Sequence, residues 1–163
     1  MSEENLPDDE VRPGESSTQR YDRNWEEILQ ELRVTQTGTQ ILTGFLLALA
    51  FQQRFAQLDT VGLTIYLVLV GLACVATALA VAPVSLHRWL FQRHAKKQIV
   101  LLGNRILRAA LVAVALLIVG VVLFLFDFVL SLTAGIIAGG VTALVIVGLW
   151  ILLPLGVLRA GRS

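Results

Sequence analysis

The sequence predicts an all-α membrane protein: a bundle of four transmembrane helices, preceded by a cytoplasmic amphipathic helix and a disordered N-terminal tail. Of its 163 residues, 56% are hydrophobic and 15% are charged, and the mean hydropathy is +0.74, values typical of membrane-embedded chains. The charges are also segregated along the chain. Residues 1–33 hold ten of the twelve acidic residues and four of the thirteen basic ones, net −6, whereas the remainder has a net charge of +7.

The N-terminal residues 1–20 are rich in Glu, Asp, Ser, Pro and Gly and contain few large apolar side chains. Such a segment buries too little surface to offset the entropy cost of ordering, so we expect a disordered acidic tail before a membrane domain at residues 21–163. The acidic start and the lack of an apolar core segment argue against a signal peptide.

Three long apolar stretches predict transmembrane helices at about residues 61–82, 106–126 and 132–153. The first of them has no charge and, at about 1.5 Å per residue, spans roughly 30 Å, the thickness of the hydrocarbon layer of a bilayer. None shows the polar stripe that a helix on the surface of a soluble protein would have. Pro83 and Pro154 are expected to end the first and the last of these spans.

A further span at residues 34–52 is less apolar, because its charge-free part contains six Thr and Gln residues. The distribution of Lys and Arg nevertheless favours a crossing. If this segment spans, twelve of the thirteen basic residues lie on one side and only Arg54 lies on the other; if it does not, the division weakens to eight against five. We therefore expect four passes with both termini in the cytoplasm.

Helical spacing places Gln36, Gln40, Thr43, Gly44 and Leu47 on one face of this first span, and we expect that face to turn inward, away from lipid. Two interpretations are open. The side chains form interhelical hydrogen bonds, or they line a polar path in an oligomeric transporter or channel. In the second case the outer mouth of the path would consist of three consecutive residues, Gln52, Gln53 and Arg54.

Upstream, residues 22–33 predict an amphipathic helix. Asn24 is placed to cap it, and apolar side chains recur at helical spacing at Trp25, Ile28, Leu29 and Leu32. We expect this stripe to lie on the cytoplasmic membrane surface with Trp25 at headgroup depth; the alternative is packing on a partner.

The loop predicted at residues 83–105 combines Trp89 with several bases and suits an interface with anionic headgroups. The alternative is a docking patch for an acidic partner, such as the chain's own tail. His87 and His94 would lie about 10 Å apart on a helix, too far to share one metal ion. The interfacial anchors we expect here are Arg88, Trp89, Arg93, Lys96 and Lys97.

In the last span, Gly135 and Gly139 form a G-x-x-x-G pattern, which lets two helices approach closely. The sequence leaves open whether the contact is within one chain or between chains. The short connection around Asp127 predicts an antiparallel hairpin of the third and fourth spans, with Ser131 or Thr133 as the cap of the last helix.

No motif for phosphate binding, metalloprotease chemistry or a serine nucleophile is present, and the apolar parts of the spans contain no ionisable group of the kind that ion-coupled carriers use. Small four-helix drug exporters typically carry a membrane-embedded Glu, which has no counterpart here. We therefore expect no enzyme activity, no cofactor, no metal and no nucleic-acid partner. The expected partners are a bilayer with anionic headgroups and either a homo-oligomer or another membrane protein.

The segments W-E-E-I-L-Q-E-L-R-V-T-Q-T-G-T-Q-I-L-T-G-F-L at 25–46, F-Q-Q-R-F at 51–55 and A-P-V-S-L-H-R at 82–88 resemble an uncharacterised family of small bacterial four-pass membrane proteins, classed as a domain of unknown function. The resemblance implies this fold and a location in the bacterial cytoplasmic membrane. It supplies no substrate and no functional residue. A structural or interaction role and a small oligomeric transporter or channel therefore remain the two hypotheses, of which we favour the first.

Overall fold

The computed structural model describes residues 17–90, 96–152 and 155, and the described part of the chain is helical apart from short connections. Four α-helices follow one another. Short helical turns follow the first and the last of them. The elements are α1 (Ser17–Leu49), the 3-10 turn η2 (Gln53–Gln57), α2 (Thr60–Leu90), α3 (Lys96–Val129), α4 (Leu132–Val147) and the π-helical turn η4 (Gly148–Leu152).

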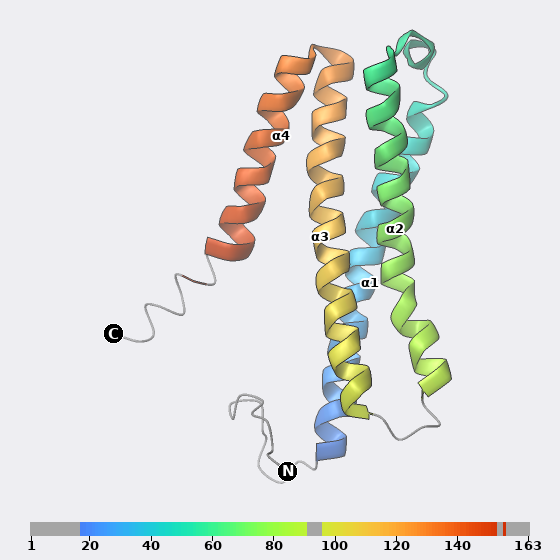
Figure 1. Ribbon diagram of the computed structural model, residues 1–163, viewed down its shortest axis with the longest axis vertical. Coiled ribbons are helices and arrows are strands. Elements are labelled where there is room, and N and C mark those ends of the chain that lie inside the picture. The colour runs from blue at the N-terminus through green and yellow to red at the C-terminus, as the bar shows by residue number, and fades with distance from the viewer. Residues whose placement is uncertain (1–16, 91–95, 153–154, 156–163) are drawn as a thin grey trace.

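Helices α1, α2 and α3 pack against one another along their length, whereas α4 packs mainly on α3 and leans away from it toward its C-terminal end (Figure 1). Three helical stretches of the described chain are long and apolar enough to cross a membrane: Thr60–Pro83, Val100–Val129 and Leu132–Leu152. The protein is therefore an all-α protein with three candidate membrane spans, and α1 is not apolar enough to be counted with them.

Helix α1 joins into one element the two helices expected at residues 22–33 and 34–52. Asn24 lies inside this helix, so its expected role as a helix cap is wrong. Helix α1 begins at Ser17, and the expected tail therefore loses its last residues to the helix. The physical reason is that neither Pro nor a run of Gly interrupts the chain between Ser17 and Leu49, so each new turn adds hydrogen bonds without a new nucleation cost. Residues 1–16 lie outside the described part.

The apolar stretch of α2 ends at Pro83, as expected, but the helix does not, because α2 continues through this residue to Leu90. Proline removes one backbone donor, but such a break is tolerated where neighbouring helices enclose it, and the Pro83 side chain is fully buried. Since α3 already begins at Lys96, most of the loop expected at 83–105 is helical. At the other end of the chain, α4 stops at Val147 and a π-helical turn leads to Leu152. The expected stop at Pro154 lies outside the described residues.

Two side-chain caps fix the helix starts at one end of the bundle. The Asp59 carboxylate accepts a hydrogen bond from the Gly62 amide at 2.7 Å, at the start of α2. Ser131 caps α4 by accepting from the Ala134 amide at 3.3 Å, which confirms one of the two caps expected there. Only Leu130 and Ser131 separate α3 from α4, so these helices form the expected antiparallel hairpin.

The core consists of three apolar clusters stacked along the α1–α2–α3 bundle. The cluster near the α1–α2 connection contains large side chains, among them Leu46, Tyr66 and Phe124. The opposite end is held by Ile28 and Leu32 of α1 against small and medium side chains of α2 and α3. The middle cluster joins α2 and α3 only, through Ala76, Ala113 and Val114.

Candidate functional site

The face that α1 turns toward α2 and α3 differs from the polar face expected inside. The side chains that α1 buries are Trp25, Ile28, Leu32, Thr39, Leu46 and Leu49, and Thr35 and Leu42 are half-buried between them. Gln36, Gln40 and Gly44 are exposed, and Thr43 is half-buried. The structure thus does not bring the two glutamines into the chain's own bundle, and the expectation that they face inward is wrong for a single chain.

Together with the half-buried Thr35 and Leu42, the buried side chains of α1 recur at alternating intervals of three and four residues from Trp25 to Leu49, the heptad spacing of helices that cross at small angles. The signal was readable in the sequence. Extending the stripe of Trp25, Ile28 and Leu32 by this rule points to Thr39 as an interior residue, and Thr39 is 0% exposed. The polarity of Gln36 and Gln40 concealed this stripe, because polar side chains suggested a separate inward face.

The threonines of α1 are satisfied within their own helix. The Thr35, Thr37, Thr39 and Thr43 hydroxyls each donate to the backbone carbonyl four residues earlier, with oxygen–oxygen distances of 2.9, 3.0, 2.9 and 2.7 Å. Such bonds let Thr enter an apolar environment without an interhelical partner. The primary amides of Gln36 and Gln40, by contrast, have no hydrogen bond within the described part of the chain.

Trp25 lies in a helix interface rather than on an open surface. Its ring packs on Gly103 of α3, where an added Cβ would come within 2.7 Å of Trp25 Cζ3, and only 7% of the residue is exposed. Ile28 and Leu32 continue this contact. The expectation that the stripe lies on the membrane surface is therefore wrong for these residues, because the first turns of the apolar stretch of α3, around Gly103 and Leu107, cover them.

The side chains of the other expected anchors lie outside the described part of the chain. Arg93 lies outside the described residues. Arg88 and Trp89 belong to α2, and Lys96 and Lys97 begin α3, but their side chains are outside the described part. Among the described residues there is no group of three or more His, Cys, Asp or Glu side chains that could hold a metal ion.

Gly135 and Gly139 pack α4 directly on the backbone of α3. An added Cβ on Gly135 would come within 2.6 Å of the Leu123 carbonyl oxygen, and one on Gly139 within 3.1 Å of Leu123 Cβ. The same test at the neighbouring Gly140 finds open space. The G-x-x-x-G pattern therefore serves a contact within one chain, at the hairpin of α3 and α4.

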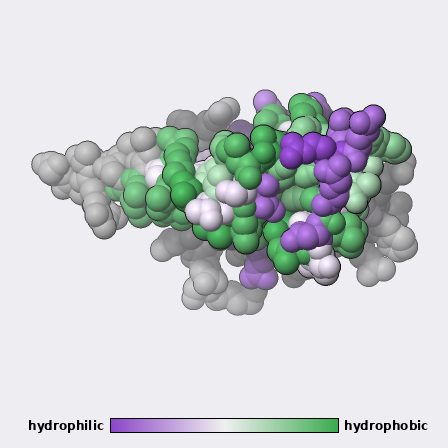
Figure 2. All heavy atoms as spheres, turned by 90° about the horizontal axis from the view of Figure 1, so that it is seen from above, coloured by the Kyte–Doolittle hydropathy of each residue, from purple (hydrophilic) through white to green (hydrophobic). Residues whose placement is uncertain are grey.

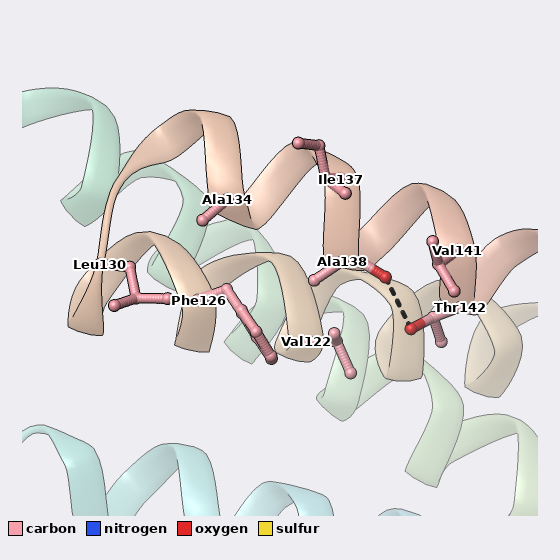
Figure 3. Close-up of a pocket in the computed structure, with 8 residues that line it drawn as sticks. All are labelled: Val122, Phe126, Leu130, Ala134, Ile137, Ala138, Val141 and Thr142. Carbon is pink, nitrogen blue, oxygen red and sulfur yellow. Dashed lines mark hydrogen bonds between the residues drawn. The ribbon is translucent and has the colours of Figure 1, made fainter.

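Beside this contact, an apolar groove of about 530 Å³ runs along the hairpin of α3 and α4 from Leu130 at the turn to Thr142 (Figure 3). Val122, Phe126 and Leu130 line it before α4, and the remaining lining side chains come from α4. The polar side chain in this lining, Thr142, donates to the Ala138 carbonyl at 2.8 Å. The groove thus offers a ligand apolar contacts and no free hydrogen-bonding side chain.

The polar features near the α1–α2 connection gather at one end of the bundle, where Figure 2 shows hydrophilic atoms beside a largely hydrophobic surface. Arg54 lies 5.5 Å above the ring of Phe128, close enough for a cation–π contact. A pocket of about 240 Å³ beside it is lined by both signs of charge, from Arg54, Asp59 and Asp127. One basic and two acidic side chains thus line this pocket, and one of the two carboxylates, that of Asp59, already accepts the hydrogen bond that caps α2.

Below this pocket lies an aromatic group that the sequence did not indicate. Tyr66 meets Phe55 edge to face at 4.8 Å between ring centroids, and Phe124 lies 5.9 Å from both Tyr66 and Phe128. The four rings come from η2, α2 and α3, so their proximity depends on the way the three segments fold together.

A family model with the description "Family of unknown function (DUF6328)" matches residues 14–154. The match covers α1 to η4. No curated protein and no solved structure matches the chain.

Proposed function

The chain belongs to the family of unknown function DUF6328, and from this premise we propose that it is an interaction protein of the bacterial cytoplasmic membrane that crosses the bilayer four times. The family itself prescribes no activity. The proposal therefore rests on the positions of the residues, above all on the outward orientation of Gln36 and Gln40.

The fourth pass is supported by the position of α1 in the bundle. Leu32 packs in one cluster with Ala80, and the backbone carbonyl of Leu46 accepts a hydrogen bond from the Tyr66 hydroxyl. Helix α1 therefore runs beside α2 through most of the Thr60–Pro83 stretch. If α2 crosses a bilayer, α1 is carried across with it. The four passes also leave twelve bases on one side and Arg54 on the other, and this bias supports a cytoplasmic location of both termini.

The interaction role is supported by the side chains that α1 turns toward α2 and α3, which form no polar path. A path through one chain would require polar side chains between the helices, but α1 presents Leu32, Thr39 and Leu46 there, and the hydroxyl of Thr39 is bonded to its own helix. The polar amides lie on the outside, where they are available to another transmembrane segment. Polar side chains on the outer face of a transmembrane helix favour association with another helix, because that helix can supply the hydrogen bonds that lipid cannot.

The alternative, a transporter or channel, is tested by ion and proton flux through proteoliposomes that contain the purified protein, compared with Gln40→Leu and with empty vesicles. We expect no flux above that of the empty vesicles across several cations and a proton gradient. Flux that appears with the wild-type protein and disappears in Gln40→Leu would overturn the interaction role and make Gln40 part of a conduction path.

A further inference from the structure

The depth of Gln40 in the bundle follows from the register of α1 against its neighbours. Leu32 of α1 lies level with Ala80 of α2, and Leu46 of α1 lies level with Tyr66 of α2. Thr39 is midway between Leu32 and Leu46, and Ala73 is midway between Tyr66 and Ala80. Thr39 therefore lies level with Ala73. Ala73 is close to the middle of the apolar stretch Thr60–Pro83. Gln40 is the next residue after Thr39 and therefore lies about 17 Å from either end of that stretch, near the centre of the bilayer.

Helix α3 gives the same depth independently. Leu32 shares a cluster with Leu107 and Ala110, and Leu46 shares one with Leu117 and Val121. The midpoint between these levels falls near Val114, the middle of the apolar stretch Val100–Val129. Both neighbours of α1 thus place Gln40 at mid-span.

At this depth the outer surface of the bundle is otherwise apolar. The exposed side chains of α2 and α3 around the level of Gln40 include Val68, Val75, Val112 and Leu116, each more than half exposed. Gln36 and Gln40 are exposed on α1 in the same zone. A primary amide that faces hydrocarbon without a partner is costly, because lipid offers no hydrogen bond in place of water.

The surroundings of Gln40 suit a second helix at close range. Thr37, Ile41, Gly44 and Ala48 are exposed on the side of α1 that points away from α2 and α3, and most of them are small. A Cβ added to Gly44 would meet no atom within 4 Å. Since the Thr37 hydroxyl already donates to the Arg33 carbonyl, the side-chain amide of Gln40 is the polar group on this face that still needs a partner.

We infer that the outer face of α1, defined by Thr37, Gln40, Ile41, Gly44 and Ala48, is a dimer interface that is covered by the same face of a second copy of this chain. The inference rests on the proposed function and names the partner. Two copies inserted in the same orientation are related by a two-fold axis along the membrane normal, so each residue on that axis meets its own counterpart at the same depth. Gln40 of one copy then faces Gln40 of the other.

The chemistry of the amide favours a second copy as the partner. A glutamine side chain has both donors and an acceptor, so two of them satisfy each other without any third group. A foreign helix would need a matching polar residue at the same depth, whereas a second copy supplies one by symmetry. Gly44, one turn away, lets the two backbones approach to the distance that this contact requires.

Disulfide cross-linking in native membranes tests the arrangement directly. In a Cys74→Ala background, which removes the chain's single cysteine, Gly44→Cys is compared with Val68→Cys. Val68 is 62% exposed on α2 and lies level with Gly44, because the two residues are equally far from the Tyr66–Leu46 contact. Under mild oxidation we expect Gly44→Cys to form a disulfide-linked dimer, whereas Val68→Cys should form no disulfide between copies. Equal cross-linking of both variants would overturn the interface.

A second measurement counts copies by single-molecule photobleaching in liposomes as the ratio of protein to lipid is lowered. We expect Gly44→Ile to abolish the dimer and Gln40→Leu to lower the association constant about threefold, the typical effect of one interhelical hydrogen bond in membranes. The matched control is Gly71→Ile, another exposed glycine with open space, on α2 at nearly the same depth. We expect this variant to dimerise like the wild-type protein.

The outcomes separate the dimer from the function on which it rests. A wild-type protein that stays monomeric and conducts nothing overturns the dimer and leaves the interaction role in place. A dimer whose flux depends on Gln40 retains the interface and overturns the interaction role. If Gly44→Cys instead cross-links to a different protein, the second copy is the wrong partner for this face.

Discussion

The hydroxyl of Tyr66 on α2 donates a hydrogen bond to the backbone carbonyl of Leu46 on α1, with 3.2 Å between the two oxygens. This carbonyl is available because α1 tightens at its end: the Ala50 amide donates to Leu47 instead of Leu46, and the next two amides follow the same pattern. The bond is buried and fixes the end of α1 at a definite height on α2. It is also one of the two contacts from which the depth of Gln40 follows.

Tyr66→Phe tests the contribution of this bond. The substitution retains the ring contacts with Phe55 and Phe124 but leaves a buried carbonyl without its partner. We expect the free energy of unfolding, measured in mixed detergent micelles, to fall by about 1–2 kcal/mol.

The matched control for Tyr66→Phe is Thr64→Val, which removes an exposed hydroxyl that is bonded only to its own helix. We expect the control to change stability by less than about 0.5 kcal/mol. Equal stability of Tyr66→Phe and the wild-type protein would show that the bond adds nothing to stability.

Replacement of Gly139 by Leu tests the contact of α4 with α3. Leu123 leaves no room for the new side chain, so the helices must separate, and we expect a loss of about 1–3 kcal/mol in unfolding experiments. The control is the adjacent Gly140→Leu, where the added side chain meets open space. If both variants lose the same stability, helix propensity or insertion rather than the α3 contact explains the effect.

Trp25 is expected to be shielded from both water and lipid by its contact with Gly103. In a Trp89→Phe background, the fluorescence of Trp25 is read in a Trp150→Phe variant and that of Trp150 in a Trp25→Phe variant. Brominated lipids and acrylamide should quench Trp25 weakly, and brominated lipids should quench Trp150 strongly, because Trp150 is 46% exposed near the end of α4. Strong quenching of Trp25 by brominated lipids would show that it lies at the membrane surface and not in the contact with Gly103.

The proposed topology predicts the location of both ends of the spans. A reporter fused after Ser163 should be active only in its cytoplasmic form, and one inserted after Gln57, in the α1–α2 connection, only in its extracytoplasmic form. A C-terminal reporter found outside the cytoplasm would contradict the assignment from the basic residues. A cytoplasmic reporter after Gln57 would contradict the crossing of α1.

The lengths of the apolar stretches and the cap at Ser131 could be predicted from the sequence because both depend on neighbours along the chain. A charge-free run of sufficient length forms a helix in a bilayer whatever it packs on. The same local reasoning failed for the helix start expected at Asn24 and, although the apolar stretch does end at Pro83, for the end of the helix there. A good cap residue remains inside a helix when the turn before it is also helical, and a proline stays inside when the fold encloses it.

The candidate site shows the same division. The sequence by itself determined that α1 carries Gln36 and Gln40 one turn apart and that α4 carries two glycines one turn apart. Only the tertiary structure decided that the glycines face α3 within the chain and that the glutamines face outward, because Trp25, Ile28, Leu32 and Thr39 occupy the side of α1 that meets the bundle. Periodicity identifies the faces of a helix, but which face becomes buried depends on the surfaces that the neighbouring helices present, such as the gap at Gly103 into which Trp25 fits.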